Sequence, residues 1–341
     1  MKTEFNSLAF AVALSAFIAP LGAADPIPVT VDNFTRAESD LYFSNMVKDG
    51  SFGKFLHRRE PASVDKQTVI RLNRDTLYSS AIFDLDAGPV TISLPDAGKR
   101  FMSMMVVNQD HYVQEVIYGA GPKTLTRAKA GTRYALVGIR TLVDPANPED
   151  VKQVHALQDA LKVEQPGGWG KFEVPDWDPV SQKKVRDALL VLASTTSSFK
   201  HAFGTKEQVD PIYHLLGTAA GWGGNPDKDA TYLNFTPPKS DGKVAYTLVV
   251  KDVPVDAFWS ISVYNAQGYF EPNPENAYSF NNLTGKKEAD GSVKIQFGGD
   301  KAGATNYLPI TPGWNYTARL YRPRKEILDG SWKFPEPQPV K

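Results

Sequence analysis

The stretch PVTISLPDAGKRFMSMMVVN, residues 89–108, indicates the fold class of this chain. Val90, Ile92 and Leu94 alternate with polar residues, and this period of two is typical of a β-strand with one buried face. FMSMMVVN follows as a second short apolar run, separated from the first by Pro, Asp and Gly. These features predict two successive strands joined by a turn.

The same pattern continues after this stretch. YVQEVIYG (112–119) and RYALVGIR (133–140) are further short β runs, so we predict a strand-rich domain over about 67–141. Before it, the segment 33–50 carries Phe34, Ala37 and Leu41 at helical spacing after Asp32 and ends at Gly50, which predicts a helix.

The middle of the chain has a different period. Apolar residues recur at helical spacing in 148–163, 178–199 and 208–221, which predicts three helices. The loop QPGGWGKFEVPDW (165–177) between the first two is rich in Gly, Pro and Trp, and we interpret it as a hinge or lid.

After residue 232 the pattern returns to short β runs. They are YTLVV (246–250), FWSISVYN (258–265), SVKIQF (292–297) and NYTARLYRP (315–323). The predicted fold class is therefore α+β and mainly β: two β-rich, sandwich-like domains joined by a helical connector. The predicted boundaries are 25–143, 144–231 and 232–341.

Composition excludes several classes of function. The 341 residues carry 38 Lys+Arg and 38 Asp+Glu, and this zero net charge argues against a nucleic-acid-binding protein. There is no Cys, hence no disulfide and no thiolate chemistry. The five His show no metal-binding spacing, and no phosphate-binding glycine motif follows a strand, so we predict neither a metal nor a cofactor.

Residues 1–24 resemble a secretory signal peptide. A short segment containing Lys2 precedes the apolar run 8–19, and Pro20 and small residues follow up to Ala24. We predict cleavage near Ala24 and a periplasmic or secreted protein. No second apolar run of membrane-spanning length follows, so the mature chain is not expected to be embedded in a membrane.

The densest polar cluster lies in VIRLNRDTLYS, residues 69–79. We interpret Val69, Ile70 and Leu72 as a strand that runs into this cluster. Its polar residues, Asn73, Arg74, Asp75 and Tyr78, are candidates for a binding site. Arg74 would grip an anion and pair with a carboxylate such as Asp110, while Asp75 or Tyr78 would take part in proton transfer. The alternative is a charge-assisted turn with no ligand.

A second cluster, NQDHYVQE (108–115), contributes Asp110 and His111 as acid/base candidates and Tyr112 as a substrate-binding candidate. His111 and Glu115 are about 13 Å apart on an extended strand, too far to bind one metal ion. The alternative interpretation is that His111 is a packed structural residue.

Aromatic residues concentrate in FWSISVYNAQGYFEPN, residues 258–273. Trp259 and Tyr264 are candidates for stacking against a ring or sugar, with Arg319 orienting an anion. Packing in the protein core is the alternative for the aromatic side chains.

These segments also resemble a known family pair. The residues 67–113, which include NRDTLYS, resemble domain of unknown function 1254. Residues 258–270 and 306–335, which include RLYRP, resemble domain of unknown function 1214, although Tyr307 stands where that family more often has Trp. The resemblance implies two β-rich domains joined by helices, commonly exported, and it implies no reaction, substrate or catalytic residue.

We therefore expect an exported protein with a polar and aromatic cleft for a small molecule. A cofactor-independent hydrolase is the first hypothesis, and a non-catalytic protein that binds glycans or envelope components is the second. A structural envelope protein is the third. The sequence leaves the oligomeric state open.

Overall fold

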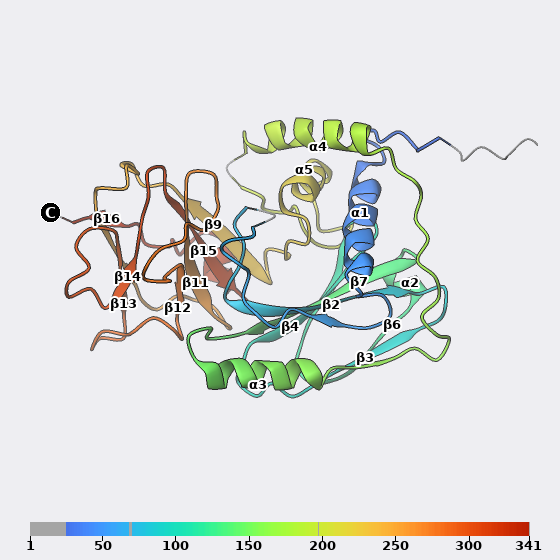
Figure 1. Cartoon of the computed structure of the whole chain (residues 1–341), viewed down its shortest axis with the longest axis horizontal. Helices are drawn as coiled ribbons and strands as arrows, with labels where there is room; N and C mark the ends of the chain where they lie inside the picture. Colours follow the sequence, from blue (N-terminus) through green and yellow to red (C-terminus); the bar gives the residue numbers. More distant parts are fainter. Residues whose placement is uncertain (1–24, 68–69, 197, 341) are drawn as a thin grey trace, which may run out of the picture.

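The structure is a computed structural model that describes residues 25–67, 70–196 and 198–340. The predicted signal peptide and Val69 lie outside these residues. The described chain forms two β-rich halves with a layer of helices over the first (Figure 1). Within the described ranges, no helix is both long enough and apolar enough to cross a bilayer.

The N-terminal half contains two sheets. The five-stranded sheet has the order β1 (Leu56–His57), β2 (Thr76–Asp84), β7 (Tyr134–Leu142), β4 (Met102–Asn108), β5 (Val113–Tyr118). The three-stranded sheet has the order β6 (Gly121–Leu125), β3 (Val90–Leu94), β8 (Lys162–Glu164). Because β8 pairs with β3, the predicted connector contributes a strand to this half.

Both faces of the five-stranded sheet are buried. Met104 and Val106 pack in one cluster with Ile92 of the three-stranded sheet. Met105 and Val107, which point the other way, pack with residues of the helical layer that include Phe43. This arrangement explains why FMSMMVVN is apolar at nearly every position.

The helical layer consists of α1 (Phe34–Lys48), α4 (Pro179–Ala193) and α5 (Pro211–Gly221), which contact one another. Helix α3 (Pro148–Asp159) lies on the other side of the five-stranded sheet in Figure 1, and α2 (Arg127–Ala130) and α6 (Lys325–Leu328) are single turns. Helices α3, α4 and α5 each begin with an Asn or Asp side-chain cap followed by Pro at the first position, so local sequence defines their starts.

The strand predicted at Val69–Leu72 is wrong for the residues that the structure describes. Ile70 and Arg71 lie in a turn, with Arg71 at φ 55°, and the strand begins only at Thr76. The Asn73 side chain accepts a hydrogen bond from the Asp75 amide at 2.8 Å, which closes an Asx turn. The polar cluster therefore precedes a strand instead of ending one.

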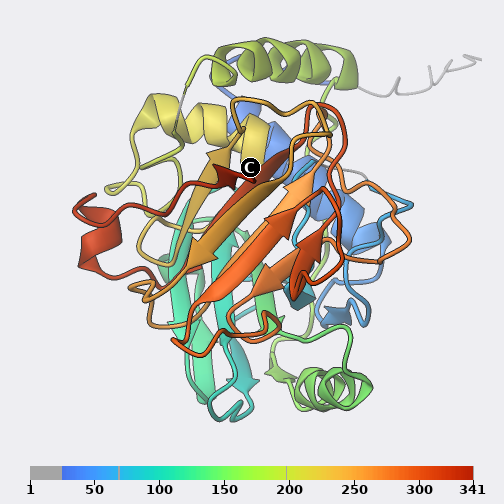
Figure 2. The same cartoon turned by 90° about the vertical axis from the view of Figure 1, so that its left-hand side faces the viewer.

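The C-terminal half is a sandwich of two four-stranded sheets. One has the order β14 (Asn306–Leu308), β13 (Val293–Phe297), β10 (Tyr246–Val250), β16 (Gln338–Pro339). The other has the order β12 (Ser279–Asn281), β11 (Trp259–Tyr264), β15 (Asn315–Tyr321), β9 (Ala230–Phe235). Figure 2 looks onto this sandwich with the N-terminal sheets behind it. The predicted class, α+β and mainly β with two sandwich-like parts, is confirmed.

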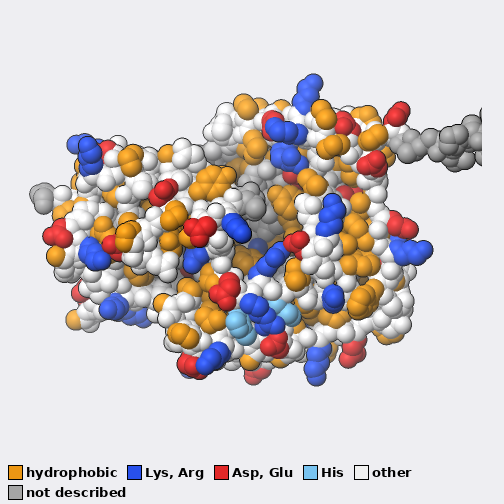
Figure 3. Space-filling view, viewed as in Figure 1, with side chains coloured by type: hydrophobic (Ala, Val, Ile, Leu, Met, Phe, Trp, Pro, Cys, Tyr) orange, Lys and Arg blue, Asp and Glu red, His pale blue; other side chains and the backbone are white. Residues whose placement is uncertain are grey.

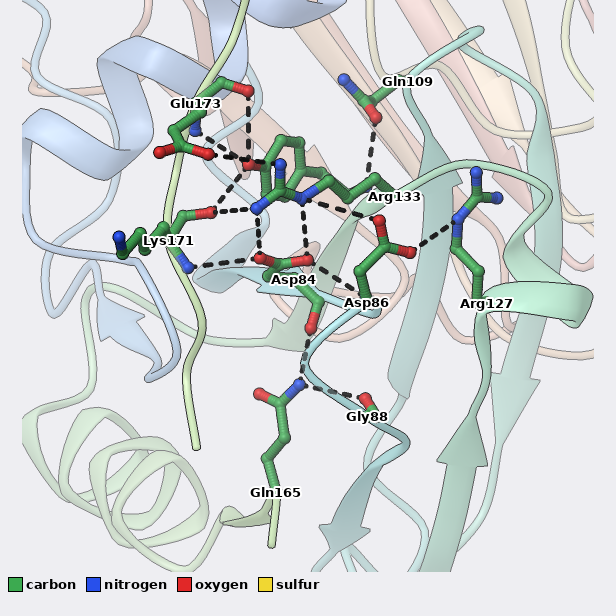
Figure 4. Close-up of polar contacts among 10 residues, drawn as sticks. Asp84, Asp86, Gly88, Gln109, Arg127, Arg133, Gln165, Lys171 and Glu173 are labelled. Atoms are coloured by element: carbon green, nitrogen blue, oxygen red, sulfur yellow. Dashed lines mark hydrogen bonds and ion pairs between the residues drawn. The ribbon is translucent and has the colours of Figure 1, made fainter. Parts of the chain in front are cut away.

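The loop 165–177 is tied down along its length (Figure 4). Asp84 pairs with Arg133 at 2.8 Å and also accepts a hydrogen bond from the Lys171 amide at 3.2 Å. The Tyr134 hydroxyl donates to the Lys171 carbonyl at 2.7 Å, and Gln165 donates to the Asp84 carbonyl at 2.8 Å. These bonds fasten the loop to the ends of β2 and β7, which argues against the predicted hinge or lid.

Helix α1 contains a buried carboxylate, Glu38, that lies within the helical layer. The side chain of Glu38 is 2% exposed and accepts hydrogen bonds from Arg186 of α4 at 2.5 and 2.7 Å. Gln182 donates to the same carboxylate at 2.9 Å. A buried carboxylate depends on such partners, because without them its desolvation is not compensated.

Arg186→Met is therefore expected to cost about 3–5 kcal/mol of unfolding free energy, since it leaves Glu38 buried without its ion pair. The matched control is Arg36→Met, which breaks the half-exposed pair with Asp110 (39% and 43% exposed). It should cost about 0–1 kcal/mol. Urea unfolding of both variants measures their losses of unfolding free energy. Equal losses would contradict the conclusion that Glu38 depends on its ion pair with Arg186.

Candidate functional site

A polar layer lies between the two halves of the molecule. On the N-terminal sheet, Tyr78 lies opposite Arg140, which lies opposite Ser103. On the C-terminal sheet, Ser260 lies opposite Arg319, which lies opposite Tyr232. The neighbouring residues of that sheet point into the sandwich core, as Trp259 and Leu320 do, so its two faces differ sharply in polarity.

Six residues of this layer form what we call the Arg140 site: Asn73, Tyr78, Arg140, Asn225, Tyr232 and Tyr321. The Asn73 amide donates to the Tyr78 hydroxyl at 3.2 Å and to the Tyr321 hydroxyl at 3.0 Å. The Asn225 amide donates to the Tyr232 hydroxyl at 2.7 Å. Three phenol groups from both halves thus meet around one guanidinium.

Arg140 is held by neutral groups. Its Nη2 donates to the Gly223 carbonyl at 3.1 Å and its Nη1 to the Asn225 side-chain oxygen at 3.3 Å, while its guanidinium carbon lies 5.5 Å from the Tyr78 ring centroid. Among the described residues, no carboxylate lies within ion-pair distance of Arg140. A half-buried positive charge is therefore oriented but not neutralised.

The hydroxyls of Tyr78 and Tyr321 respond to this charge differently. Burial alone would raise the pKa of Tyr78, but Arg140 beside it lowers that pKa below the ordinary value of 10.0. Burial raises the pKa of Tyr321 well above 10.0. Tyr78 is therefore the more readily ionised of the two hydroxyls.

The site reaches the molecular surface. Tyr232 is 38% exposed, and Tyr78 and Arg140 are partly exposed. The face drawn in Figure 3 is hollowed between α1, α5 and the C-terminal half, with acidic and basic side chains around the hollow.

A second part of the polar layer surrounds Asp75. Arg319 donates to the Tyr264 hydroxyl at 2.6 Å, to the Ser262 hydroxyl at 2.9 Å and to the carbonyl of Arg71 at 2.8 Å. Asp75 is buried beside it and has only a long bond, 3.4 Å, from Asn281. The second carboxylate oxygen of Asp75 has no partner in the described chain. Burial raises the pKa of Asp75, although Arg319 acts in the opposite direction.

Two family profiles match the chain. Protein of unknown function DUF1254 matches residues 52–138, and protein of unknown function DUF1214 matches residues 236–325. The chain is a DUF1254–DUF1214 protein. No curated protein matches it. The Arg140 site joins the DUF1254 part (Asn73, Tyr78) to the DUF1214 part (Tyr321), with three residues from the segment between them.

Two solved structures have the same fold. The VPA0106 protein from Vibrio parahaemolyticus is 18% identical with a TM-score of 0.69, and the alignment covers 91% of this chain and 98% of that one. An uncharacterized protein from Burkholderia cenocepacia is 14% identical with a TM-score of 0.51, covering 91% and 86%. At these identities the likeness extends to the fold alone.

The three acid/base candidates do not come together. Thr76, next to Asp75, pairs with Leu142, whereas Asn108, close to Asp110, pairs with Ala135 on the same strand. These partners are about 23 Å apart along β7. The DUF1254 sheet therefore holds Asp75 and Asp110 at opposite ends.

The predicted pairing of Arg74 with Asp110 is wrong for the same reason. Arg74 donates to the Ala62 carbonyl and lies over the Tyr278 ring at 5.2 Å. Asp110 pairs with Arg36 of α1 at 2.5 Å.

His111 occupies a structural position. Its Nε2 accepts a hydrogen bond from the Gly223 amide at 2.8 Å, so its Nδ1 carries the proton and donates to the Thr218 hydroxyl at 2.8 Å. Burial, together with His214, holds the pKa of His111 well below 6.5. Both ring nitrogens are occupied, which leaves neither for acid/base chemistry in this arrangement.

The predicted aromatic candidates lie in three different parts of the molecule. Tyr112 stacks on His214 at 4.6 Å, near α5. Trp259 is 6% exposed and packs in the DUF1214 sandwich core, away from the polar layer. The Tyr264 hydroxyl is buried in that layer and donates to the Leu72 carbonyl at 2.7 Å.

Sequence reasoning missed Arg140, Asn225, Tyr232 and Tyr321. The one available signal was Arg140 itself, a charged residue at the end of the otherwise apolar run ALVGI. The other three are separated from it by 80 residues or more and meet it only in the folded chain.

His111→Phe tests the structural role of His111. The variant keeps a ring against Trp222 but leaves the Gly223 amide without its acceptor and removes the donor to the Thr218 hydroxyl, so we expect a loss of about 1–3 kcal/mol at pH 7. The folded pKa lies below 6.5, so the wild type loses stability as pH falls below 6.5 and the variant lacks this loss. The difference in unfolding free energy between wild type and variant, measured by urea unfolding, should therefore become smaller as the pH is lowered from 7 to 5. A difference that stays the same at both pH values would contradict the lowered pKa of His111.

Asp75→Asn tests the buried carboxyl. Because the folded pKa lies above 3.8, the folded protein binds this proton more tightly, and its stability declines as pH rises from about 4 through the raised pKa. The variant should lack this decline, so its stability relative to wild type should increase with pH, by at most about 1.4 kcal/mol for each step of one in pH. Urea unfolding of the variant and the wild type between pH 4 and 8 measures this change in relative stability. Parallel pH profiles for variant and wild type would overturn the prediction.

Proposed function

We propose that this is an exported binding protein for a small hydroxylated carboxylic acid, such as a sugar acid, held at the Arg140 site between the DUF1254 and DUF1214 parts. The observation that carries the proposal is the half-buried Arg140 with no carboxylate partner in the described chain. Export rests on the signal-like residues 1–24.

The geometry of Arg140 favours a carboxylate. A guanidinium offers five N–H donors in a planar fork that matches the two oxygens of a carboxylate. The Gly223 and Asn225 oxygens orient this fork without cancelling its charge. A ligand carboxylate would supply the missing negative charge in a partly desolvated place, where such a pair is stronger than in water.

The surroundings of Arg140 favour hydroxyl groups on the same ligand. Tyr78, Tyr232 and Tyr321 can each donate or accept a hydrogen bond, and the Asn73 and Asn225 amides add further donors. The partly exposed ring of Tyr232 also offers an aromatic face, on which sugar rings pack well.

Binding is better supported than hydrolysis. None of the predicted acid/base candidates lies in the Arg140 site. Asp75 and Asp110 lie at opposite ends of the sheet, and His111 is occupied on both nitrogens. If the bound acid also reacts, Tyr78 is the group suited to proton transfer, because Arg140 lowers its pKa.

Calorimetric titration with glucuronate tests the proposal, with neutral glucose as the matched ligand. We expect glucuronate to bind and glucose to bind at least tenfold more weakly. Arg140→Gln should reduce glucuronate affinity at least tenfold, which corresponds to about 1.4 kcal/mol. Arg74→Gln replaces a partly buried arginine outside the Arg140 site that is bound to a backbone carbonyl; it is the control and should bind as wild type. Equal affinity for both sugars, or unchanged binding by Arg140→Gln, would contradict the proposal.

A further inference from the structure

The Arg140 site contains two asparagine side chains, Asn73 and Asn225, whose orientation is fixed by their neighbours. The side-chain oxygen of Asn73 accepts a hydrogen bond from the backbone amide of Asp75 at 2.8 Å. The side-chain oxygen of Asn225 accepts a hydrogen bond from Arg140 at 3.3 Å. A backbone amide and a guanidinium can only donate. The oxygen of each asparagine therefore faces its donor, and its NH2 group is directed toward the phenol groups of the site.

The three phenol oxygens of the site accept hydrogen bonds from these NH2 groups. Asn73 donates to the Tyr321 hydroxyl at 3.0 Å and to the Tyr78 hydroxyl at 3.2 Å. Asn225 donates to the Tyr232 hydroxyl at 2.7 Å. Because an amide NH2 group cannot accept, the phenol oxygen is the acceptor in each of these bonds. The proton of each phenol is therefore left to be donated to another group.

The pKa of Tyr78 agrees with this direction. Burial would raise the pKa, but Arg140 and hydrogen bonds from Thr76 and Asn73 lower it, because each of them favours the ionised phenol. The Asn73 NH2 group also lies 3.4 Å from the Thr76 hydroxyl. The groups around the Tyr78 oxygen thus act as donors toward it.

The donors of the site outnumber the acceptors that the described chain provides. No described residue accepts a hydrogen bond from the hydroxyls of Tyr78, Tyr232 or Tyr321. Arg140 has five N–H groups, and its acceptors are the Gly223 carbonyl, the Asn225 oxygen and the weakly accepting sulfur of Met105. A ligand at this site therefore meets donors, while the asparagine oxygens are already in use.

We propose that Asn73 and Asn225 are positioning residues that set this direction, so that the Arg140 site selects an ionised carboxylate over the carboxamide of the same shape. The inference rests on the proposed function, since it concerns the ligand of the same site. A carboxylate has two accepting oxygens and no proton, whereas a carboxamide would turn two N–H groups toward other donors. Donors that are left unpaired in a partly desolvated place are costly.

Asn73→Asp reverses two of these hydrogen bonds with little change in side-chain size. The new carboxylate still accepts from the Asp75 amide, so the turn stays closed. Its other oxygen accepts from the hydroxyls of Tyr78 and Tyr321, to which Asn73 donates in the wild type. These two protons are then lost to the ligand, and the phenol oxygens become free to accept from it.

Calorimetric titration with glucuronate and glucuronamide, the amide of the same sugar acid, tests the selection. The wild type should bind glucuronate at least tenfold more tightly. Asn73→Asp should weaken glucuronate binding at least tenfold and strengthen glucuronamide binding about two- to tenfold, the value of one hydrogen bond. The added negative charge by itself would weaken glucuronate binding only. Glucuronamide binding that is unchanged or weaker in Asn73→Asp would therefore overturn the proposal.

The pKa of Tyr78 gives a second readout, which needs no ligand. Carbon-13 NMR of tyrosine labelled at the ring carbon that bears the hydroxyl follows ionisation, and Tyr78→Phe identifies the signal. Asn73→Asp should raise the pKa of Tyr78, because a donor is replaced by a negative charge. Asn73→Ser should raise it less, because serine can close the turn but is too short to reach the phenols. Asn147→Asp, at the exposed cap of α3, is the matched control and should change neither this pKa nor binding.

The two readouts separate this inference from the proposed function. Absence of glucuronate binding by the wild type would contradict the proposed function and the ligand selection with it, while the Tyr78 titration would still decide the role of Asn73. A pKa of Tyr78 that is the same in the wild type, Asn73→Asp and Asn73→Ser would contradict the positioning role even if glucuronate binds. Asn73→Ser carries this second test alone if Asn73→Asp does not fold.

Discussion

The buried guanidinium of Arg319 is the contact on which the junction of the two halves depends. Arg319 stands in the middle of a DUF1214 sheet and donates to carbonyls of Arg71 and Leu72, on the segment that leads into the first long strand of the DUF1254 sheet. Only one face of that DUF1214 sheet is polar, so this face must find hydrogen-bond partners when it is buried. The turn 71–75 supplies them, and the two halves pack as one body around it.

The same constraint explains where ligand-binding groups can lie. Buried side chains of the polar layer that form several hydrogen bonds, such as Arg319 and Tyr264, hold the halves together. Arg140, in the same layer, lies nearer the surface and has neutral partners only. The residues that hold the halves together and the proposed ligand-binding residues therefore share one layer but are different residues.

The prediction from sequence succeeded where local patterns were decisive. Val90, Ile92 and Leu94 alternate as strand residues do, and the apolar spacing in 178–199 and 208–221 predicted helices that the structure has as α4 and α5. It failed at Ile70 and Leu72, because an apolar pair beside polar residues can be a strand or a turn, and the Asn73 side chain closes a turn. His111 beside Asp110 suggested acid/base chemistry, yet contacts with Thr218 and Gly223 make His111 structural.

The sequence by itself determined the order of β-rich, helical and β-rich segments, the helical spacing of the middle segment and the family resemblance, because these depend on residues close together in the chain. The tertiary structure decided which polar groups are paired. Asp75 lacks a close partner while Arg319 forms four hydrogen bonds, and Arg140 meets Asn225 and Tyr321 only after both halves have folded. Burial and pairing of charges depend on contacts between distant segments, and no local pattern encodes them.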